Sequence, residues 1–550
     1  MQKIINCFRD HSTTRLKWLF LFTIFLLIIS AITALVPIKF VEKIVNSLSE
    51  EATASQIVYF GCLYVLFQVI NYCFQAISRS MADYVQYNVG NNLQLKLFRK
   101  LMYADLLALE KKNVFETSNI LMEDCAYVNN QLMKPVIQSV FAFTSFCTAL
   151  IYMLTINIQL TFIMVPLGII TAFASHAIQK RTDINITNQR KGSHQLWKVF
   201  LEGISGIKTI RVFQYKEHYT TKVQERNNKL KKINIKQSYI ENISENLIGL
   251  LFMLSIGTIL IVSAFMVHQQ QVSIGSMLAI LLYNHMLTDP FLEIVEIRNK
   301  TTKLRISLDR IYSIFSLKED SLLNAVAESI DTMEVSGLSF AYENKNIIDN
   351  LSFNVTKPAN ICIMGPSGCG KSTLAKILSK LYDTGENSVE FYKGGQSIAK
   401  PHVSYLMQDA YLFDLSIEEN IKLANPNITR KQFNELISLS CLENVLERHQ
   451  DIPIGMNGSR LSGGERKRVL IAQTLAKPNT DILLFDELSS SLDISTAEKI
   501  FRNLADLRMN KICIFIEHSD AYLHYMNIIF HYKDGNFHKI DNGTKCLEKS

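Results

Sequence analysis

Residues 365–373 read Gly-Pro-Ser-Gly-Cys-Gly-Lys-Ser-Thr, and this stretch decides the fold of the carboxyl-terminal half. It matches the pattern Gly-x-x-x-x-Gly-Lys-[Ser/Thr], in which backbone N–H groups of a glycine-rich turn surround phosphate oxygens. The apolar run from Asn360 to Met364 predicts a strand before the loop. A helical pattern from Lys371 to Leu381 follows, so a positive helix end faces the phosphates. We therefore expect a nucleoside triphosphate site.

Each residue type in this loop has a physical task. Lys371 supplies a full positive charge to the β- and γ-phosphates, and the hydroxyl of Ser372 can hold Mg²⁺. We expect ATP or GTP, together with Mg²⁺, as ligands. The residues expected to contact the nucleotide here are Gly365, Pro366, Ser367, Gly368, Cys369, Gly370, Lys371, Ser372 and Thr373.

The rest of the chain predicts a membrane-embedded half. The 550 residues are 48% hydrophobic, which is high for a soluble protein. Several apolar stretches approach the ~20 residues that cross a hydrocarbon core of ~30 Å. No charge interrupts Leu19 to Ile38, which is longer than a signal-peptide core. We place the spans at 17–39, 56–78, 133–155, 158–178, 247–267 and 274–296.

The positions of lysine and arginine predict the orientation. They concentrate before the first span, after the second and, from Lys180 to Lys236, after the fourth, whereas the turns near 156–157 and 268–273 carry none. Because cytoplasmic loops are enriched in these residues, we expect a multi-pass cell-membrane protein with both termini cytoplasmic. This topology explains most of the net charge of +7, and no nucleic-acid partner is expected, since stacking aromatics are not interleaved with the basic stretches.

Two further motifs follow the phosphate loop. The apolar run Ile482 to Phe485 ends in Asp486 and Glu487, where Asp486 can bind Mg²⁺ through water and Glu487 can polarise the attacking water. Between them, Leu461-Ser462-Gly463-Gly464-Glu465 opens a helical pattern. The free N–H groups and the dipole at such a helix start suit an anion such as a γ-phosphate.

In this order and spacing, the motifs resemble those of an ATP-binding cassette (ABC) transporter of the exporter-type half-transporter class. The resemblance covers essentially the whole chain. It implies a membrane all-α transmembrane domain over 1–316, with six helices and long cytoplasmic helical extensions. A linker over 317–329 and an α/β P-loop NTPase domain, the ABC nucleotide-binding domain, over 330–550 would follow.

The resemblance also implies roles for single residues. Tyr342 in Phe340-Ala341-Tyr342 resembles the adenine-stacking residue, and Gln408, Asp493 and His518 resemble the Gln-loop, D-loop and switch residues. The implied catalytic residues are Glu487, His518 and Gln408. The implied Mg²⁺ ligands are Ser372, Gln408 and, through water, Asp486. The remaining implied nucleotide contacts are Ser462, Gly463, Gly464 and Asp493.

One copy of each motif implies a dimer. In this family the Ser462 to Gly464 signature of one subunit closes on ATP held by Lys371 of the other. A homodimer is expected, and a heterodimer remains open. Coupling segments are expected at Asn113 to Ile120 and Lys216 to Tyr219. The departures from the family pattern are Glu465 in place of Gln, Leu488 in place of Pro or Ala, and Met456 in place of Glu.

The substrate is the least constrained expectation. The resemblance extends to the peptide and bacteriocin exporter group, so we expect export of an amphipathic substrate, a peptide first of all. The alternatives are a lipid or drug flippase, a thiol exporter, or a protein of another class, an ATP-gated regulatory or channel-like membrane protein. Polar side chains are costly against lipid, so they should face the bundle interior. The residues expected to line a mixed cavity are Tyr72, Tyr152, Tyr283, Asn71 and Asn284.

Overall fold

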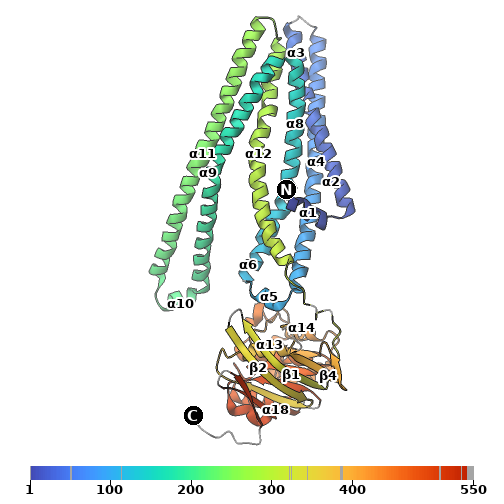
Figure 1. The fold of residues 1–550 in the computed structure, drawn as a ribbon, viewed down its shortest axis with the longest axis vertical. Coiled ribbons are helices and arrows are strands. Elements are labelled where there is room, and N and C mark those ends of the chain that lie inside the picture. The colour runs from blue at the N-terminus through green and yellow to red at the C-terminus, as the bar shows by residue number, and fades with distance from the viewer. Residues whose placement is uncertain are drawn as a thin grey trace. The chain divides into compact units, whose positions relative to one another are not determined.

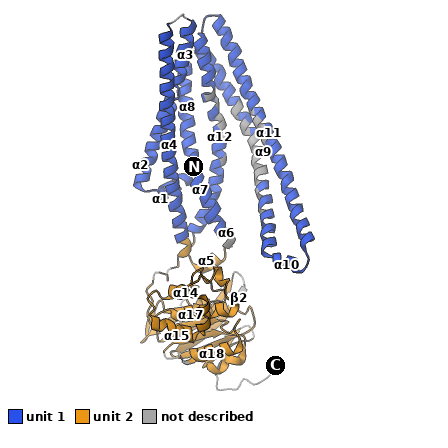
Figure 2. Ribbon diagram, turned by 180° about the vertical axis from the view of Figure 1, so that it is seen from behind, with its two compact units in different colours: residues 1–99, 114–316 blue, residues 100–113, 317–550 orange. Residues whose placement is uncertain are grey.

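The chain folds as two units in the computed structural model (Figure 2). Unit 1 comprises Met1–Arg99 and Val114–Ser316, and unit 2 comprises Lys100–Asn113 and Leu317–Ser550. The short segment 100–113 therefore folds with the carboxyl-terminal half, although two predicted spans flank it in the sequence. The residues that the structure describes are 2–49, 53–112, 114–320, 322–323, 325–342, 345–383, 388–506, 510–533 and 536–541.

In the described residues of unit 1, the regular secondary structure is all helical, which confirms the membrane all-α class. Its longest helices combine an apolar part with a polar one, and α9 and α11 run side by side as a hairpin closed by α10 (Figure 1). The helices are α1 Gln2–His11, α2 Thr14–Thr33, α3 Val36–Ser49, α4 Ala54–Met102, α6 Val114–Asn119, α7 Cys125–Gln131, α8 Lys134–Ile156, α9 Ile158–Ser205, α10 Ile207–Val212, α11 Lys216–His268 and α12 Ile274–Phe315.

Four helical stretches of the described chain are long and apolar enough to cross a membrane. They are Thr14–Ser49, Ala54–Met102, Glu116–Ile156 and Gly249–His268. Shorter apolar segments, Ile158–Ile170 and Ile274–Asn284, begin α9 and α12. Each of the six predicted spans overlaps one of these stretches, and four of the stretches are long enough to cross a membrane.

The first predicted span differs from expectation because it is not one continuous helix. Helix α2 ends at Thr33, a turn follows at 34–35, and α3 begins at Val36. Pro37 lies in the first turn of α3, where its missing N–H is tolerated, whereas in a helix interior it would remove a hydrogen bond and clash with the preceding turn. The proline thus explains the new helix start.

The polar side chains of the spans connect helices to one another. Asn71 Nδ2 donates to Ser30 O at 2.6 Å and to Thr33 Oγ1 at 3.1 Å. Tyr283 Oη donates to Leu35 O at 3.0 Å. The residues predicted to line a mixed cavity do not share one open surface in this structure. Tyr283, Asn284 and Asn71 are buried, and Tyr152 donates to Glu42. Tyr72, in contrast, is 68% exposed.

Unit 2 contains two sheets. The smaller one is antiparallel in the order β2-β1-β4-β5, and the larger one has the order β10-β9-β3-β8-β7-β6. The small sheet consists of β1 Thr332–Tyr342, β2 Lys345–Thr356, β4 Val389–Lys393 and β5 Gln396–Ile398. The large sheet consists of β3 Ala359–Met364, β6 Val403–Leu406, β7 Ile482–Asp486, β8 Ile512–Ile516, β9 Ile528–Lys533 and β10 Asn536–Asp541.

The large sheet forms the centre of unit 2. Every residue of β3, β7 and β8 is buried, as expected for parallel strands covered on both faces. One face packs on α13, and the other packs on α17 and α18. The helices are α5 Leu106–Glu110, α13 Lys371–Leu378, α14 Ile417–Ala424, α15 Arg430–Leu439, α16 Glu443–His449, α17 Gly463–Ala476 and α18 Ile494–Asp506. The predicted α/β nucleotide-binding fold is confirmed.

Candidate nucleotide site

The site lies at the carboxyl edge of the large sheet. Strand β6 pairs with β7, β7 with β8, and β8 with β3, all in parallel. The register joins Leu406 to Phe485 and Asp486 to Ile516, so the four strands end at one level. Loops that leave parallel strands at one edge form the usual ligand crevice of such sheets.

One cavity of about 290 Å³ collects the residues that follow these strands. It brings together the phosphate loop after β3, Gln408 after β6, Asp486 and Glu487 at the end of β7, and His518 after β8. The complete lining is Tyr342, Ile347, Ser367, Gly368, Gly370, Lys371, Ser372, Thr373, Gln408, Asp486, Glu487 and His518. All of these except Ile347 belong to the predicted site.

The phosphate loop has a conformation that requires glycine at position 370. Gly370 has a φ of 100°, and a Cβ built on it would lie 2.3 Å from Cγ2 of Ile347. The residue caps α13, whose N–H groups therefore point toward the cavity. Lys371 Nζ donates to the carbonyl oxygens of Gly365 at 2.8 Å and Pro366 at 2.9 Å, so the ammonium lies inside the loop.

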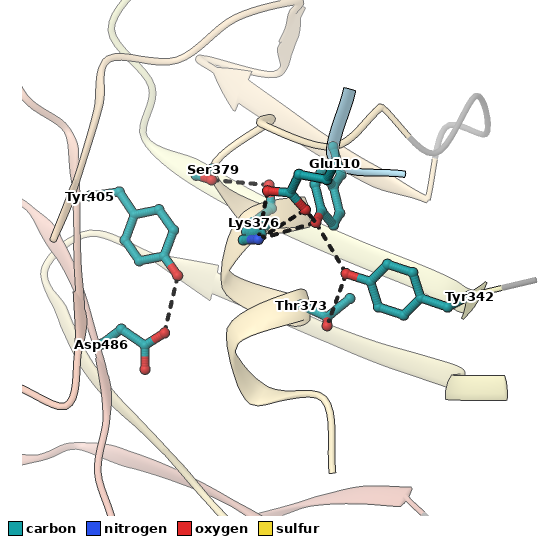
Figure 3. Close-up of polar contacts among 8 residues, drawn as sticks. Glu110, Tyr342, Thr373, Lys376, Ser379, Tyr405 and Asp486 are labelled. Atoms are coloured by element: carbon teal, nitrogen blue, oxygen red, sulfur yellow. Dashed lines mark hydrogen bonds and ion pairs between the residues drawn. The ribbon is translucent and has the colours of Figure 1, made fainter. Parts of the chain in front are cut away.

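Asp486, a carboxylate in the cavity lining, is buried, at 1% exposed. Burial raises its pKa, while hydrogen bonds from Ser372 and Tyr405 act in the opposite direction. Tyr405 Oη donates to Oδ2 of Asp486 at 3.3 Å (Figure 3). Asp486, Ser372 and Gln408 all offer oxygen to one cavity. This donor set fits Mg²⁺, which prefers oxygen ligands and completes its shell with water and phosphate.

Glu487 meets both other residues predicted to act in catalysis. Its Oε1 accepts from Gln408 Nε2 at 3.1 Å and lies 3.4 Å from His518 Nε2. Its own N–H donates to Ile516 O at 2.9 Å, and its φ is 52°, a left-handed backbone conformation. The turn therefore directs the carboxylate of Glu487 toward the loops after β6 and β8.

Two buried charged residues of the site were missed by the sequence reasoning. Glu517, between β8 and His518, accepts from the N–H of Ser489 at 3.0 Å and from its hydroxyl at 2.6 Å. Lys467 Nζ donates to the carbonyl of Asp486 at 3.1 Å. Burial raises the pKa of Glu517 and lowers that of Lys467. A charged residue directly after an entirely apolar strand was the available signal for Glu517.

The signature residues lie outside this lining, and they form a separate helix start. Ser462 caps α17: its Oγ accepts from Glu465 N, and Glu465 Oε2 accepts from Ser462 N. Arg448 pairs with the other oxygen of Glu465. A Cβ on Gly464 would lie 2.9 Å from Ser491 O, so the glycine permits close contact with the loop that leads to Asp493.

The segment 100–113 is fastened to unit 2 at both of its sides. The N–H of Asp105 donates to Lys318 O at 2.9 Å, and the N–H of Asp320 donates to Tyr103 O at 3.0 Å. Leu106 and Leu107 pack on the core around α13. The predicted coupling segment begins further along, at Asn113, which lies outside the described residues.

Two protein families match this chain. The ABC transporter transmembrane region matches residues 20–291, and the ABC transporter family matches residues 348–490. A structure described as a bacterial Atm1-family ABC exporter with ATP bound has a TM-score of 0.80 at 19% identity. The alignment covers 96% of this chain and 95% of that one. The likeness shows the same fold.

Curated relatives align over most of their length. The multidrug resistance-like ATP-binding protein MdlA of Buchnera aphidicola is 25% identical over 91% of this chain and 90% of its own. The probable multidrug resistance ABC transporter ATP-binding/permease protein YheI of Bacillus subtilis is 24% identical over 80% and 78%. The beta-(1→2)glucan export ATP-binding/permease protein NdvA of Rhizobium etli is 21% identical over 92% and 88%.

Proposed function

The chain belongs to the ATP-binding cassette (ABC) transporter family, and we propose that it exports an amphipathic substrate, a peptide first of all, across the cytoplasmic membrane. ATP hydrolysis coupled to transport follows from the family and from the half-transporter exporter architecture. The observation that carries the proposal is the convergence of Lys371, Asp486 and Glu487 on one cavity, in a chain with membrane-spanning helices.

The residues of the cavity divide the chemistry among them. In the proposal, Lys371 and the N–H groups before α13 hold the phosphates, and Tyr342 stacks on adenine. Ser372, Gln408 and Asp486 would hold Mg²⁺, which when bound would offset the phosphate charge. Oε1 of Glu487 accepts the proton of the attacking water. His518, whose Nε2 lies 3.4 Å from that oxygen, orients the carboxylate of Glu487.

Half-transporter exporters act as dimers in the bilayer, and the α9–α11 hairpin supports a second copy of this chain as the partner. At its tip, Val212 is 76% exposed and Phe213 is 74% exposed. Exposed apolar groups of this size mark interaction sites. In the proposed homodimer, the second copy covers this tip, and its Ser462 to Gly464 complete the ATP site. In the same proposal, both termini of the chain are cytoplasmic, as the distribution of lysine and arginine predicts.

An apolar cavity between α8 and α12 supports an amphipathic substrate. Its volume is about 640 Å³, within the range of small-ligand pockets. The cavity is lined by Val140, Ala142, Phe143 and Phe146 of α8 and by Pro290 and Ile297 of α12, and Ser139 adds a hydroxyl. Such a lining can hold apolar side chains of a peptide without selecting one sequence.

The second candidate is export of lipophilic drugs. The same apolar lining favours it, and two relatives at 24% and 25% identity carry multidrug resistance descriptions. A peptide carries backbone hydrogen-bonding groups that a lipophilic drug lacks. Measuring how strongly each compound inhibits transport of the other would therefore show which class the protein prefers.

Transport into inside-out vesicles tests the proposal. ATP should drive accumulation of a fluorescent amphipathic peptide in vesicles that contain the wild-type chain. Glu487→Gln vesicles should accumulate none, because hydrolysis is lost while the membrane half is unchanged. If a lipophilic dye accumulates and every tested peptide is inert, the peptide assignment is wrong and the drug alternative holds. If no tested compound moves and ATP only changes ion conductance, export itself is wrong.

A further inference from the structure

A chain of hydroxyl groups leads from the phosphate-loop helix to the segment 100–113 (Figure 3). Thr373 Oγ1 lies 3.5 Å from Tyr342 Oη, to which it donates. Tyr342 Oη donates to Tyr382 Oη at 3.1 Å. Tyr382 Oη in turn donates to Oε2 of Glu110. Side chains from three separate parts of the sequence, Glu110, Tyr342 and the pair Thr373 and Tyr382, thus form one connected series.

The direction of these bonds is fixed by the protons available. Burial raises the pKa of Tyr382, and the bond to Glu110 raises it further, so the phenol stays protonated. A phenol has one proton to donate, and Glu110 is a carboxylate that can only accept. Tyr382 must therefore accept from Tyr342. Lys376 Nζ donates to Tyr382 Oη at 3.1 Å and to Glu110 Oε1 at 3.0 Å, which holds both acceptors in place.

The aromatic rings restrict Tyr342 further. Its ring is nearly perpendicular to that of Tyr382, at 86°, and to that of Phe340, at 89°, with centroids 6.3 and 5.1 Å apart. Edge-to-face packing of this kind has a preferred geometry. The ring orientation of Tyr342 therefore depends on both its hydroxyl partner and its ring neighbours.

Glu110 is the last residue of α5 and belongs to a firmly attached segment. Asp105 caps α5 by accepting from Ala108 N at 3.0 Å, and Leu106 and Leu107 pack on the core of unit 2. In the sequence, the segment continues from α4 and leads to α6, two helices of the membrane half. Glu110 is thus the contact through which this connection reaches the nucleotide cavity.

We propose that Tyr382 and Glu110 are positioning residues that orient the Tyr342 ring for adenine, so that affinity for adenine nucleotides depends on the segment 100–113. The proposal rests on the proposed function, in which Tyr342 contacts the base. It concerns the base: Lys371, which holds the triphosphate, bonds to the carbonyl oxygens of Gly365 and Pro366, and the phosphate loop joins the series only through the hydroxyl of Thr373. Adenine-dependent and triphosphate-dependent binding should therefore respond differently to substitutions at Tyr382.

Calorimetric titration of the full-length protein with MgATP and with Mg-tripolyphosphate, which lacks a base, tests this. Tyr382→Phe keeps the ring and removes the hydroxyl. It should weaken MgATP binding about three- to tenfold, the usual effect of one hydrogen bond, and leave tripolyphosphate affinity unchanged. Tyr342→Phe should weaken ATP similarly, and the double variant should lose no more than either single one, because both remove the same bond. Glu110→Ala should act in the same direction as Tyr382→Phe.

The matched control is Tyr392→Phe. Tyr392 also donates its hydroxyl to a carboxylate, that of Glu390, but it lies on β4 and not on the nucleotide cavity. This variant should bind both ligands as the wild type does. Since both affinities come from one sample, partly unfolded protein would reduce both binding stoichiometries and leave the affinity ratio unchanged.

The outcomes separate the two proposals. If Tyr342→Ala weakens ATP binding and Tyr382→Phe leaves the ratio of the two affinities unchanged, the positioning role is wrong and the proposed function stands. If Tyr342→Ala itself leaves ATP affinity unchanged, Tyr342 does not contact adenine, and the proposed role of Tyr342 is wrong together with the positioning role. A fall in ATP affinity alone in Tyr382→Phe supports both.

Discussion

The two units use polar residues in opposite ways. In unit 2, polar and charged side chains from distant parts of the sequence meet at one sheet edge and line one cavity. In unit 1, Asn71 and Tyr283 connect neighbouring helices. Residues of the nucleotide site can be recognised in the sequence because they follow the ends of strands at a characteristic spacing. Polar residues in the spans have no such spacing, and here they hold the helix bundle together.

Replacement of Glu487 should have the greatest consequence for turnover. Glu487→Gln should bind MgATP and lose hydrolysis by about 10²- to 10⁴-fold, the usual contribution of a positioned general base. The variant keeps the size of the side chain, so thermal stability should remain near wild type. Steady-state phosphate release and MgATP titration measure the two quantities. Turnover close to wild type would remove Glu487 from the mechanism.

Substitutions at Lys371 and Tyr342 should separate the contribution of charge to MgATP affinity from the contribution of ring stacking. Lys371→Ala should abolish measurable MgATP binding, since it removes the charge inside the phosphate loop. Tyr342→Ala should weaken the free energy of MgATP binding by about 1–3 kcal/mol, by analogy with base–aromatic stacking. Titration with MgATP under identical salt measures both. Equal losses in the two variants would mean that Tyr342 does more than stack on the base.

In the membrane half, Asn71→Leu tests whether the polar residues are structural. Losing the bonds to Ser30 and Thr33 should lower helix-bundle stability by about 0.6–1.7 kcal/mol, the range for hydrogen bonds between membrane helices. Basal ATPase activity should not change. Tyr72→Phe, at the exposed neighbouring residue, is the control and should change neither quantity. Thermal unfolding in detergent measures stability, and a large loss of transport without loss of stability would favour a substrate contact.

The smallest effect is expected at the signature. The N–H of Ser462 and the Arg448 guanidinium lower the pKa of Glu465. A lowered pKa means that the charged carboxylate stabilises the fold above its unfolded pKa, ~4.3, and that this contribution is lost as the pH falls through the folded value. Glu465→Gln should therefore lower the melting temperature slightly at pH 7, and the difference should shrink progressively as the pH falls below the unfolded pKa of ~4.3. If the difference in melting temperature does not depend on pH, it arises from the shape of the side chain and not from its charge.

Some of the fold and site was predictable, and the reason differs between elements. The strand predicted at Asn360 to Met364 is found as β3, Ala359–Met364, because a short apolar run of this kind specifies a buried strand. Helix and strand positions then bring Gln408, Glu487 and His518 together through the parallel register. The break between α2 and α3 was readable from Pro37 and was overlooked.

Glu110 could not be found in the same way. Its partners Lys376 and Tyr382 lie 266 and 272 residues away, and no local pattern marks a pairing over that separation. The coupling segment at Asn113 to Ile120 was predicted from the resemblance to the family. The contact of Glu110 within unit 2 comes from the helix before that segment, α5. Long-range side-chain pairs of this kind need the three-dimensional structure.

The attachment of residues 100–113 to unit 2 limits how halves of such transporters can be exchanged. A chimera that joins this membrane half to a foreign nucleotide domain after residue 316 would keep Leu106, Leu107 and Glu110 but replace their partners. Apolar side chains and a carboxylate would then meet an unmatched surface. The exchangeable part of this chain is therefore discontinuous, and a working graft should carry residues 100–113 together with 317–550.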